Sequence, residues 1–292
     1  MRSRSVEKIL PPPPVHFVGD GFRVHNFIPG VHPLSMQRMD PFIMLDYNSR
    51  YYFSPANKPR GVGVHPHRGF ETVSIAYHGK IAHHDSAGNS GVIGEGDVQW
   101  MTAGSGVLHK EYHEKEFSKK GGLFQMVQIW VNLPAKDKMT PAKYQAIENK
   151  DMGKVMLEDK NSFVEIIAGE FKGIKGPAYT FTPMSMFNAK LGKGGITGFN
   201  FPERNNTGFL MIEGEIKLNG SKVASEDSFI LFNHDGENIT IEALKESIVL
   251  IISGEPINEP IASYGPFVMN TESEIKKAYE DFYNGKFGHL ED

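Results

Sequence analysis

The sequence of 292 residues contains no cysteine, which excludes disulfide bonds, iron–sulfur clusters and thiolate zinc sites. Any metal ion in this protein must therefore be bound by histidine, aspartate or glutamate. The sequence also lacks an apolar run long enough to span a bilayer, and no apolar signal segment follows the basic start at residues 1–5. We therefore expect no membrane contact and a cytoplasmic location, or a nuclear one if the source is eukaryotic.

An excess of positive charge is absent as well. The 31 lysines and arginines are outnumbered by 35 aspartates and glutamates, the formal net charge is −4, and the isoelectric point is about 6.3. Proteins that bind nucleic acids directly present a basic face, so direct nucleic-acid binding is not expected. Hydrophobic residues make up 39% and charged residues 23% of the chain, which is typical of a soluble globular protein with a substantial core.

The chain is rich in short apolar runs separated by glycine, proline, asparagine and aspartate. These runs begin after Gly21, and examples lie at residues 72–77, 97–101 and 123–131. Runs of that length and spacing are typical of strands in an all-β sandwich or barrel. Four consecutive prolines at residues 11–14 predict a short, exposed polyproline arm ahead of these strands.

Two segments are predicted to be helical. Thr271 and Glu274 form a capping box, and the apolar residues that follow recur at helical spacing up to Gly285. These apolar residues are Ile275, Ala278, Tyr279 and Phe282. They predict an amphipathic C-terminal helix that docks on a barrel. A shorter helix is predicted at residues 143–147, in the segment that connects the two halves of the chain.

Two short motifs carry the candidate chemistry, His65-Pro66-His67 and His109-Lys110-Glu111. Residues i and i+2 of a β-strand point to the same face of the sheet. If the two strands are neighbours, three imidazoles and one carboxylate therefore point into a single space. That ligand set suits a divalent transition metal such as iron, manganese, nickel, copper or zinc.

A weak internal repeat indicates a duplicated β-barrel. The segment at 77–81 resembles that at 212–216, 135 residues later, and Asp97 has a counterpart in Asp227, 130 residues later. With these shifts, the candidate ligands correspond to positions in the second copy that offer no good transition-metal ligand. Those positions are Asn200, Pro202, Ile239 and Ile241. The second barrel is therefore predicted to be metal-free.

The segments at 61–73 and 96–111, which carry the two ligand pairs, resemble the pirin family of two-domain cupins. The sequences His-Pro-His-Arg-Gly and Gln-Trp-Met-Thr-Ala-Gly are specific to that resemblance, which extends from about residue 20 to 285. It implies an all-β bicupin, with two facing double-stranded β-helix (jelly-roll) barrels and a short C-terminal helix. The predicted division is a proline-rich arm (1–19), a metal-binding barrel (20–135), and a third part (136–292) comprising a linker, a metal-free barrel and the helix.

The pirin resemblance also implies one mononuclear metal, usually iron as Fe2+, in the N-terminal barrel only. Its ligands would be His65, His67, His109 and Glu111, and Mn, Ni, Cu, Zn or Co remain open as alternatives to iron. Other cupins take their carboxylate ligand soon after the histidine pair, at the position of Glu71 in this chain. Strand alternation predicts that Glu71 also faces inward. The resemblance favours Glu111, with Glu71 as an outer group or a buried acid.

Two classes of function follow from the resemblance. One is a quercetin 2,3-dioxygenase, in which a small aromatic flavonol binds as its oxyanion together with O2 and Glu111 acts as the catalytic general base. The other is an iron-dependent regulatory protein, a transcription co-regulator or a partner of metabolic enzymes. A third possibility is a scaffold that the metal stabilises and that catalyses no reaction. The regulatory class leaves open which protein would be the partner.

The remaining histidines are predicted to be structural or on the surface. His113 shares strand parity with the ligands and is predicted at the rim or surface. Only one of His83 and His84 can face inward, because neighbours in a strand point to opposite faces. Arg68 is predicted to form a structural or surface ion pair, and Trp100 is predicted to lie in the core.

Overall fold

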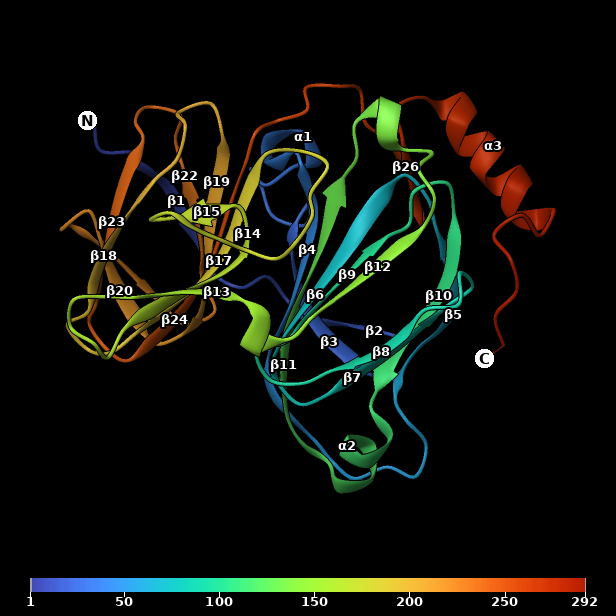
Figure 1. Ribbon diagram of the computed structural model, residues 1–292, viewed down its shortest axis with the longest axis horizontal. Coiled ribbons are helices and arrows are strands. Elements are labelled where there is room, and N and C mark those ends of the chain that lie inside the picture. Colours follow the sequence, from blue (N-terminus) through green and yellow to red (C-terminus); the bar gives the residue numbers. More distant parts are fainter. Residues whose placement is uncertain (1, 292) are drawn as a thin grey trace. The chain divides into compact units, whose positions relative to one another are not determined.

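Figure 1 shows the computed structural model, which describes residues 2–291 and consists mostly of strands. These residues divide into two compact units. The unit named here the C-terminal barrel combines residues 2–12 with 150–256, and the N-terminal barrel combines 13–149 with 257–291. Within the described part of the chain, no helix has both the length and the apolar character needed to cross a membrane.

The N-terminal barrel is built from two antiparallel sheets. The larger has the order β12 (Lys143–Ile147), β9 (Val98–Thr102), β6 (Phe70–His78), β11 (Gly122–Asn132), β4 (Phe42–Phe53), β3 (Phe22–Ile28) and β2 (His16–Val18). The smaller has the order β5 (Gly61–His67), β10 (Val107–His113), β7 (Ile81–Asp85) and β8 (Ser90–Ile93). Gln128 on β11 donates to Glu111 on β10, so the inner faces of the two sheets meet.

Short elements complete this unit. They are the helices α1 (Met36–Met39) and α2 (Lys115–Lys120), the 3-10 turn η1 (Ala135–Asp137), the hairpin of β25 (Ala262–Tyr264) and β26 (Phe267–Met269), and the helix α3 (Glu272–Tyr283). The predicted capping box of α3 is confirmed, because the Thr271 hydroxyl accepts from the backbone of Glu274 while the Glu274 carboxylate accepts from that of Thr271.

The C-terminal barrel has the same plan. Its larger sheet has the order β1 (Val6–Leu10), β22 (Phe229–Phe232), β19 (Asn206–Glu213), β24 (Ser247–Gly254), β17 (Met184–Leu191), β14 (Phe163–Ala168) and β13 (Gly153–Met156). Its smaller sheet has the order β18 (Ile196–Asn200), β23 (Asn238–Ala243), β20 (Glu215–Leu218) and β21 (Lys222–Ser225). The remaining elements are the hairpin of β15 (Glu170–Phe171) and β16 (Ile174–Lys175) and the 3-10 turn η2 (Asn149–Asp151). The matching strand order confirms the predicted duplication and the all-β bicupin fold.

The register of equivalent strands shows what replaces the candidate ligands in the second copy. In the N-terminal barrel, His65 on β5 lies opposite His109 on β10. In the C-terminal barrel, Phe199 on β18 lies opposite Ile239 on β23. Phe201 then takes the place of the second histidine of the pair, and its ring is stacked on that of Phe199 with the ring centroids 6.1 Å apart.

The positions predicted by the 135-residue shift, Asn200 and Pro202, are therefore wrong by one residue, because the spacing of the two copies in this strand is 134. The equivalents on β23, Ile239 and Ile241, are those predicted. All four true equivalents are buried and apolar, and they form part of the core of this barrel. Hydrocarbon side chains offer no atom that binds a metal, so these positions serve packing alone.

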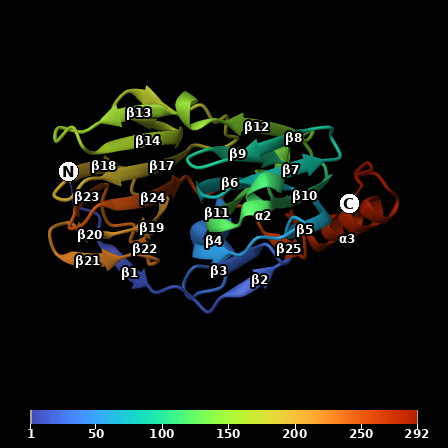
Figure 2. The ribbon, with the colours of Figure 1, turned by 90° about the horizontal axis from the view of Figure 1, so that it is seen from below.

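The structure differs from the predicted domain boundaries at both ends of the chain. Strand β1, from the predicted arm, pairs with β22, and its Val6 and Ile9 pack against the core of the C-terminal barrel. Helix α3 packs instead in the N-terminal unit, where Ile275 and Ala278 contact Phe267. Figure 2 shows α3 beside β25, at the red end of the colour scale. Apolar residues at each terminus thus cover the barrel that lies farther away in sequence.

The predicted helix at 143–147 is also wrong. These residues form β12, which pairs along its whole length with β9 at the edge of the larger sheet. Local composition permits a helix here, but an open sheet edge offers backbone partners that a short isolated helix would lack. This strand carries Tyr144, whose contacts matter at the site described below.

Candidate metal centre

The three candidate histidines meet on the inner face of the smaller sheet. His109 lies directly opposite His65, and His67 follows two residues along the same strand. The ring centroids are 4.3 Å apart for His65 and His109, 4.7 Å for His67 and His109, and 4.8 Å for His65 and His67. One ligand atom from each lies within 4.8 Å of the other two. The structure therefore brings these three predicted ligands together.

The hydrogen bonds of the three rings leave the same nitrogen available in each. Nδ1 of His65 lies 2.8 Å from the carbonyl oxygen of Gly63, and Nδ1 of His67 lies 3.3 Å from that of Pro266. A carbonyl only accepts, so each Nδ1 donates, which leaves Nε2 as the ring nitrogen available to a metal. Nε2 of His109 is buried without a hydrogen-bond partner. A buried, unpartnered nitrogen among two others of the same kind fits a metal ion.

The ionisation of these rings supports the same conclusion. Burial, with the neighbouring histidines acting in the same direction, lowers the pKa of His67 and of His109 well below the ordinary value of 6.5. Both rings are therefore neutral at physiological pH. Neutral imidazole is the form that binds a cation, so these two side chains need to lose no proton when a metal arrives.

Glu111 lies beside the three histidines but in a second group of potential ligands, with His83 and His109. Nε2 of Gln128 donates to one of its carboxylate oxygens at 2.6 Å. The other oxygen accepts from the amide of Gln99 and from the hydroxyl of Ser74, the latter at 3.2 Å. Three donors fix the position of the carboxylate. Coordination by Glu111 stays a prediction.

Glu71 does not face the centre, and the predicted strand parity is wrong. Gly69, with φ at +89°, interrupts the alternation between His67 and Glu71. On β6, Ser74 points to the centre, so Glu71, an odd number of residues away, points to the opposite face. Glu71 is fully buried and accepts a hydrogen bond from the Thr102 hydroxyl at 2.7 Å. Burial outweighs this bond and raises the pKa of Glu71 from 4.5 to about 7.

Sequence reasoning missed several residues that surround the centre. His83 is the inward member of the pair at 83–84, and it lies opposite Glu111 because β7 pairs with the other edge of β10. Asp85 follows two residues later and lies opposite His109. The i, i+2 spacing of His83 and Asp85 is the same signal that identified the ligand pairs. Tyr144 gave no such signal, because its segment was predicted to be helical.

The other predictions for single residues have mixed outcomes. His113 is fully buried, not at the rim, because Nε2 bonds to the Gly21 carbonyl at 2.8 Å and the ring packs among phenylalanines. Arg68 forms the predicted structural ion pair, with Asp281 at 3.0 Å. Trp100 lies in the core as predicted, with none of its surface exposed.

A cavity of about 400 Å³ opens onto His65 and His67, two of the three histidines, from inside the barrel. Its walls are mainly apolar, and three polar side chains, Asp46, Asn48 and Gln128, lie among them. The apolar lining residues are Val18, Phe22, Val24, Met44, Val62, Met126 and Trp130. His65, His67 and Glu111 also line it. A flat, mostly apolar molecule in this cavity would therefore contact the candidate ligands directly.

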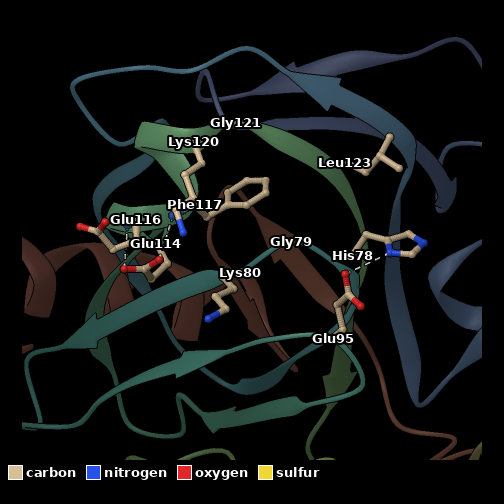
Figure 3. A pocket seen from close by; sticks show the side chains of 10 residues that line it. All are labelled: His78, Gly79, Lys80, Glu95, Glu114, Glu116, Phe117, Lys120, Gly121 and Leu123. Carbon is tan, nitrogen blue, oxygen red and sulfur yellow. Dashed lines mark hydrogen bonds and ion pairs between the residues drawn. The ribbon is translucent and has the colours of Figure 1, made fainter.

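A second cavity, of about 560 Å³, lies between α2 and the β6–β7 turn and is shown in Figure 3. Several of its charged groups have internal partners. Glu114 caps the N-terminus of α2, and His78 contacts Glu95 at 3.2 Å. Neither group of potential metal ligands found among residues 2–291 includes a residue of this cavity. We therefore place the functional site at the histidine cavity.

Comparison with known proteins agrees with this fold. The family model Pirin matches residues 21–131, and the model Pirin C-terminal cupin domain matches residues 186–288. A Pseudomonas aeruginosa protein provisionally named quercetin 2,3-dioxygenase is 43% identical over 93% of this chain and 94% of its own length. Human Pirin is 34% identical over 87% of this chain and 84% of its own length.

A solved structure gives the same result. The crystal structure of quercetin 2,3-dioxygenase from Acinetobacter baumannii is 45% identical in sequence, with a TM-score of 0.93, and the match covers 99% of this chain and 100% of that one. The two family models together match most of the chain, and both barrels are present in the structure. The resemblance found in the sequence is thereby confirmed: this chain belongs to the pirin family.

Proposed function

We propose that this protein is a metal-dependent dioxygenase of the quercetin 2,3-dioxygenase type, acting on a small aromatic substrate and O2. One observation carries the proposal. Three buried or half-buried histidines bring ligand nitrogens within 4.8 Å of one another, and two of them, His65 and His67, line a mainly apolar cavity of about 400 Å³. The names of relatives at 43% and 45% identity support the same reaction class.

The metal in this proposal is one divalent transition ion, Fe2+ in the first instance, held by His65, His67, His109 and Glu111. Manganese, nickel, copper, zinc and cobalt are the alternatives, because nitrogen and carboxylate ligands accept all of them. When bound, such an ion supplies Lewis acidity that lowers the pKa of a coordinated hydroxyl, and it retains open coordination positions.

The residues of the chain supply binding and proton transfer. Phe22, Met126 and Trp130 form the apolar walls against which a flat aromatic ring packs. Asp46 and Asn48 provide hydrogen-bonding groups for ring hydroxyls, and the carbonyl oxygen of the Asn48 side chain is buried without a partner. An aromatic molecule with several hydroxyl groups satisfies both kinds of surface.

Glu111 is the group placed to accept the proton of the reacting hydroxyl. Its carboxylate lines the cavity, and the amides of Gln99 and Gln128 donate to it and fix its position. A base fixed in this way loses little freedom when substrate binds. Gln128 also lines the cavity and keeps the carboxylate turned toward it.

Replacing Glu111 with glutamine is expected to lower turnover by about 10²–10⁴-fold, because the amide cannot accept the substrate proton. It should also weaken metal binding, since a carboxylate ligand is lost. Turnover and metal content of Glu111→Gln would be compared with those of Glu95→Gln, which changes an exposed carboxylate in the cavity of Figure 3. Wild-type turnover in Glu111→Gln would contradict the role of Glu111. A metal-bound structure with Glu71 at about 2.0–2.2 Å from the ion and Glu111 turned away would reverse the ligand choice.

The metal-loaded protein is expected to oxidise flavonols in air. The measurement is loss of the flavonol absorbance band together with oxygen uptake and release of carbon monoxide. Chelation and the His67→Ala substitution should each stop the reaction, because both remove the metal. Absence of oxygen uptake across a panel of flavonols and catechols would favour the alternative, an iron-dependent regulatory protein that acts through a protein partner. Turnover that survives chelation in His67→Ala would show that the oxidation does not occur at this site.

A further inference from the structure

We propose that Asp85 and His83 form a hydrogen-bonded relay to His109, named here the imidazole relay, which fixes the tautomer and orientation of His109 as a metal ligand. The inference rests on the metal centre of the proposed function and adds two positioning residues to it. Neither His83 nor Asp85 belongs to the ligand set implied by the pirin resemblance.

The relay lies on the side of His109 away from the other two ligands. Strand β7 pairs with β10 so that Asp85 lies opposite His109 and His83 lies opposite Glu111. Nδ1 of His109 is 3.5 Å from Nδ1 of His83, and Nε2 of His83 is 3.3 Å from Oδ2 of Asp85. None of these three side chains is more than 4% exposed. The contacts are thus shielded from competing water.

The direction of the hydrogen bonds follows from Asp85. Its carboxylate already accepts from the backbone nitrogens of Ala87 at 3.0 Å and Asn89 at 2.9 Å, and from the Asn89 amide. Burial alone would raise the pKa of Asp85, but the bonds from His83 and Asn89 hold it below its ordinary value. Asp85 is therefore an anion that only accepts.

The rest of the relay has one arrangement. Because Asp85 only accepts, Nε2 of His83 must donate to it. With that one proton on the His83 ring, Nδ1 of His83 is the acceptor for Nδ1 of His109. This leaves Nε2 of His109 deprotonated and free, in the same state as Nε2 of His65 and His67. Coordination at Nε2 makes the Nδ1–H of an imidazole a stronger donor, so the His109–His83 contact is expected to shorten when metal binds.

Tyr144 supports both the relay and the base. Its ring stacks on that of His83, with centroids 5.0 Å apart and an angle of 16° between the planes. Its hydroxyl donates to Oε1 of Gln99 at 3.2 Å, which turns the amide nitrogen of Gln99 toward Glu111. Burial raises the pKa of Tyr144 to about 12, so the hydroxyl remains a donor. Through Tyr144, strand β12 therefore packs against His83 and orients Gln99, which donates to Glu111.

A second metal ion bound by His83, His109 and Glu111 is the competing interpretation, because these residues also lie within 4.8 Å of one another. It would require both nitrogens of His109 to bind metal, with loss of the remaining ring proton. It would also require Glu111 to give up oxygens that now accept from Gln99 and Gln128. The hydrogen-bonded relay satisfies the same atoms without either change.

The test compares His83→Phe with the matched control His84→Phe, using Co2+ as the probe. Phenylalanine at 83 can still stack on Tyr144 but cannot accept a hydrogen bond from His109. His84 is next in the same strand, faces outward and contacts the Tyr112 hydroxyl at 3.1 Å. Competition with a chelator gives the Co2+ dissociation constant, and the visible absorption of bound Co2+ reports its ligand geometry. We expect the dissociation constant to rise by roughly 10–100-fold in His83→Phe, with a shifted spectrum, and neither change in His84→Phe.

Two further variants keep the test decisive. His83→Gln retains an acceptor for His109 and should recover part of the affinity and of the wild-type spectrum. Asp85→Asn loses the charge that sets the direction of the relay and should weaken binding even if His83→Phe fails to fold. Wild-type affinity and spectrum in all three variants, or two Co2+ ions per wild-type chain, would overturn the relay. Wild-type protein that binds no Co2+ would overturn the relay and the metal centre together. Weakened binding in the variants of a protein that oxidises no flavonol would leave the relay standing and overturn only the proposed reaction.

Discussion

Replacing His109 with alanine is expected to remove the bound metal almost entirely. The His109 ring lies close to both other candidate histidines, with ring centroids 4.3 Å from His65 and 4.7 Å from His67. Its loss removes one of the four proposed ligands and leaves two imidazoles on one strand and the Glu111 carboxylate, so the effect should exceed the roughly 10–100-fold loss of affinity typical of outer partners. Elemental analysis after dialysis should show about one transition metal per wild-type chain and almost none in His109→Ala. His65→Ala should behave in the same way.

The matched control for these variants is His78→Ala, which removes a half-buried histidine outside both groups of potential ligands. Its metal content should equal that of the wild-type protein. Full metal occupancy in both His109→Ala and His65→Ala would refute the assignment of the centre. Metal located between residues 196 and 243 would refute the conclusion that Phe199 and Ile239 have replaced the ligands in the second barrel.

Replacing Glu71 with glutamine is expected to stabilise the protein above neutral pH. Burial raises the pKa of Glu71 from 4.5 to about 7, so the folded protein holds this proton more tightly than the unfolded chain does. The stability associated with that proton is fully present below pH 4.5 and is lost as the pH rises through 7. The difference between the two pKa values corresponds to roughly 3 kcal/mol. Glutamine cannot ionise, so the variant escapes this loss.

The measurement is the free energy of unfolding of both proteins between pH 4 and pH 8. The difference in favour of Glu71→Gln should be near zero at pH 4 and approach roughly 3 kcal/mol at pH 8. Glu95→Gln, at an exposed position, should show no such trend. The metal content of Glu71→Gln should change less than that of Glu111→Gln. A difference that does not vary with pH would mean that Glu71 titrates normally in the folded protein.

The parts of the site that could be predicted are those set by local strand geometry. Residues i and i+2 share a face wherever a strand runs regularly. β5 pairs with β10 without a shift from His67 to His65, and β10 pairs with β7 without a shift from His109 to Glu111, although the β5–β10 register shifts between His109 and Glu111. The spacing within the pairs at 65–67 and 109–111 is therefore enough to predict where the centre lies. The same rule failed for Glu71, because Gly69 with φ at +89° reverses the alternation within four residues. A single glycine with a left-handed backbone conformation is therefore enough to make a prediction of side-chain direction from strand alternation wrong.

The parts that could not be predicted depend on contacts between segments far apart in sequence. His113 follows the parity of the ligands, yet it is buried because the Gly21 carbonyl and Phe124 lie beside it. Tyr144 reaches His83 only because β12 finds the open edge of β9. The sequence around His113 and the sequence around Tyr144 contain nothing that indicates these contacts. The repeat, by contrast, was detectable because both copies keep a glycine with positive φ at the same turn, Gly79 and Gly214.

The exchange of terminal segments between the two units has a consequence for synthesis on the ribosome. Residues 257–291 complete the N-terminal barrel, yet they are the last part of that barrel to emerge. The carbonyl that holds Nδ1 of His67 belongs to Pro266, and the acid that pairs with Arg68 is Asp281. A nascent chain that has finished β5 and β10 therefore lacks the groups that orient one ligand and anchor the strand beside it. We expect tight metal capture to follow the emergence of these residues, so that a nascent chain that ends before Pro266 binds the ion more weakly than one that includes residues 257–291.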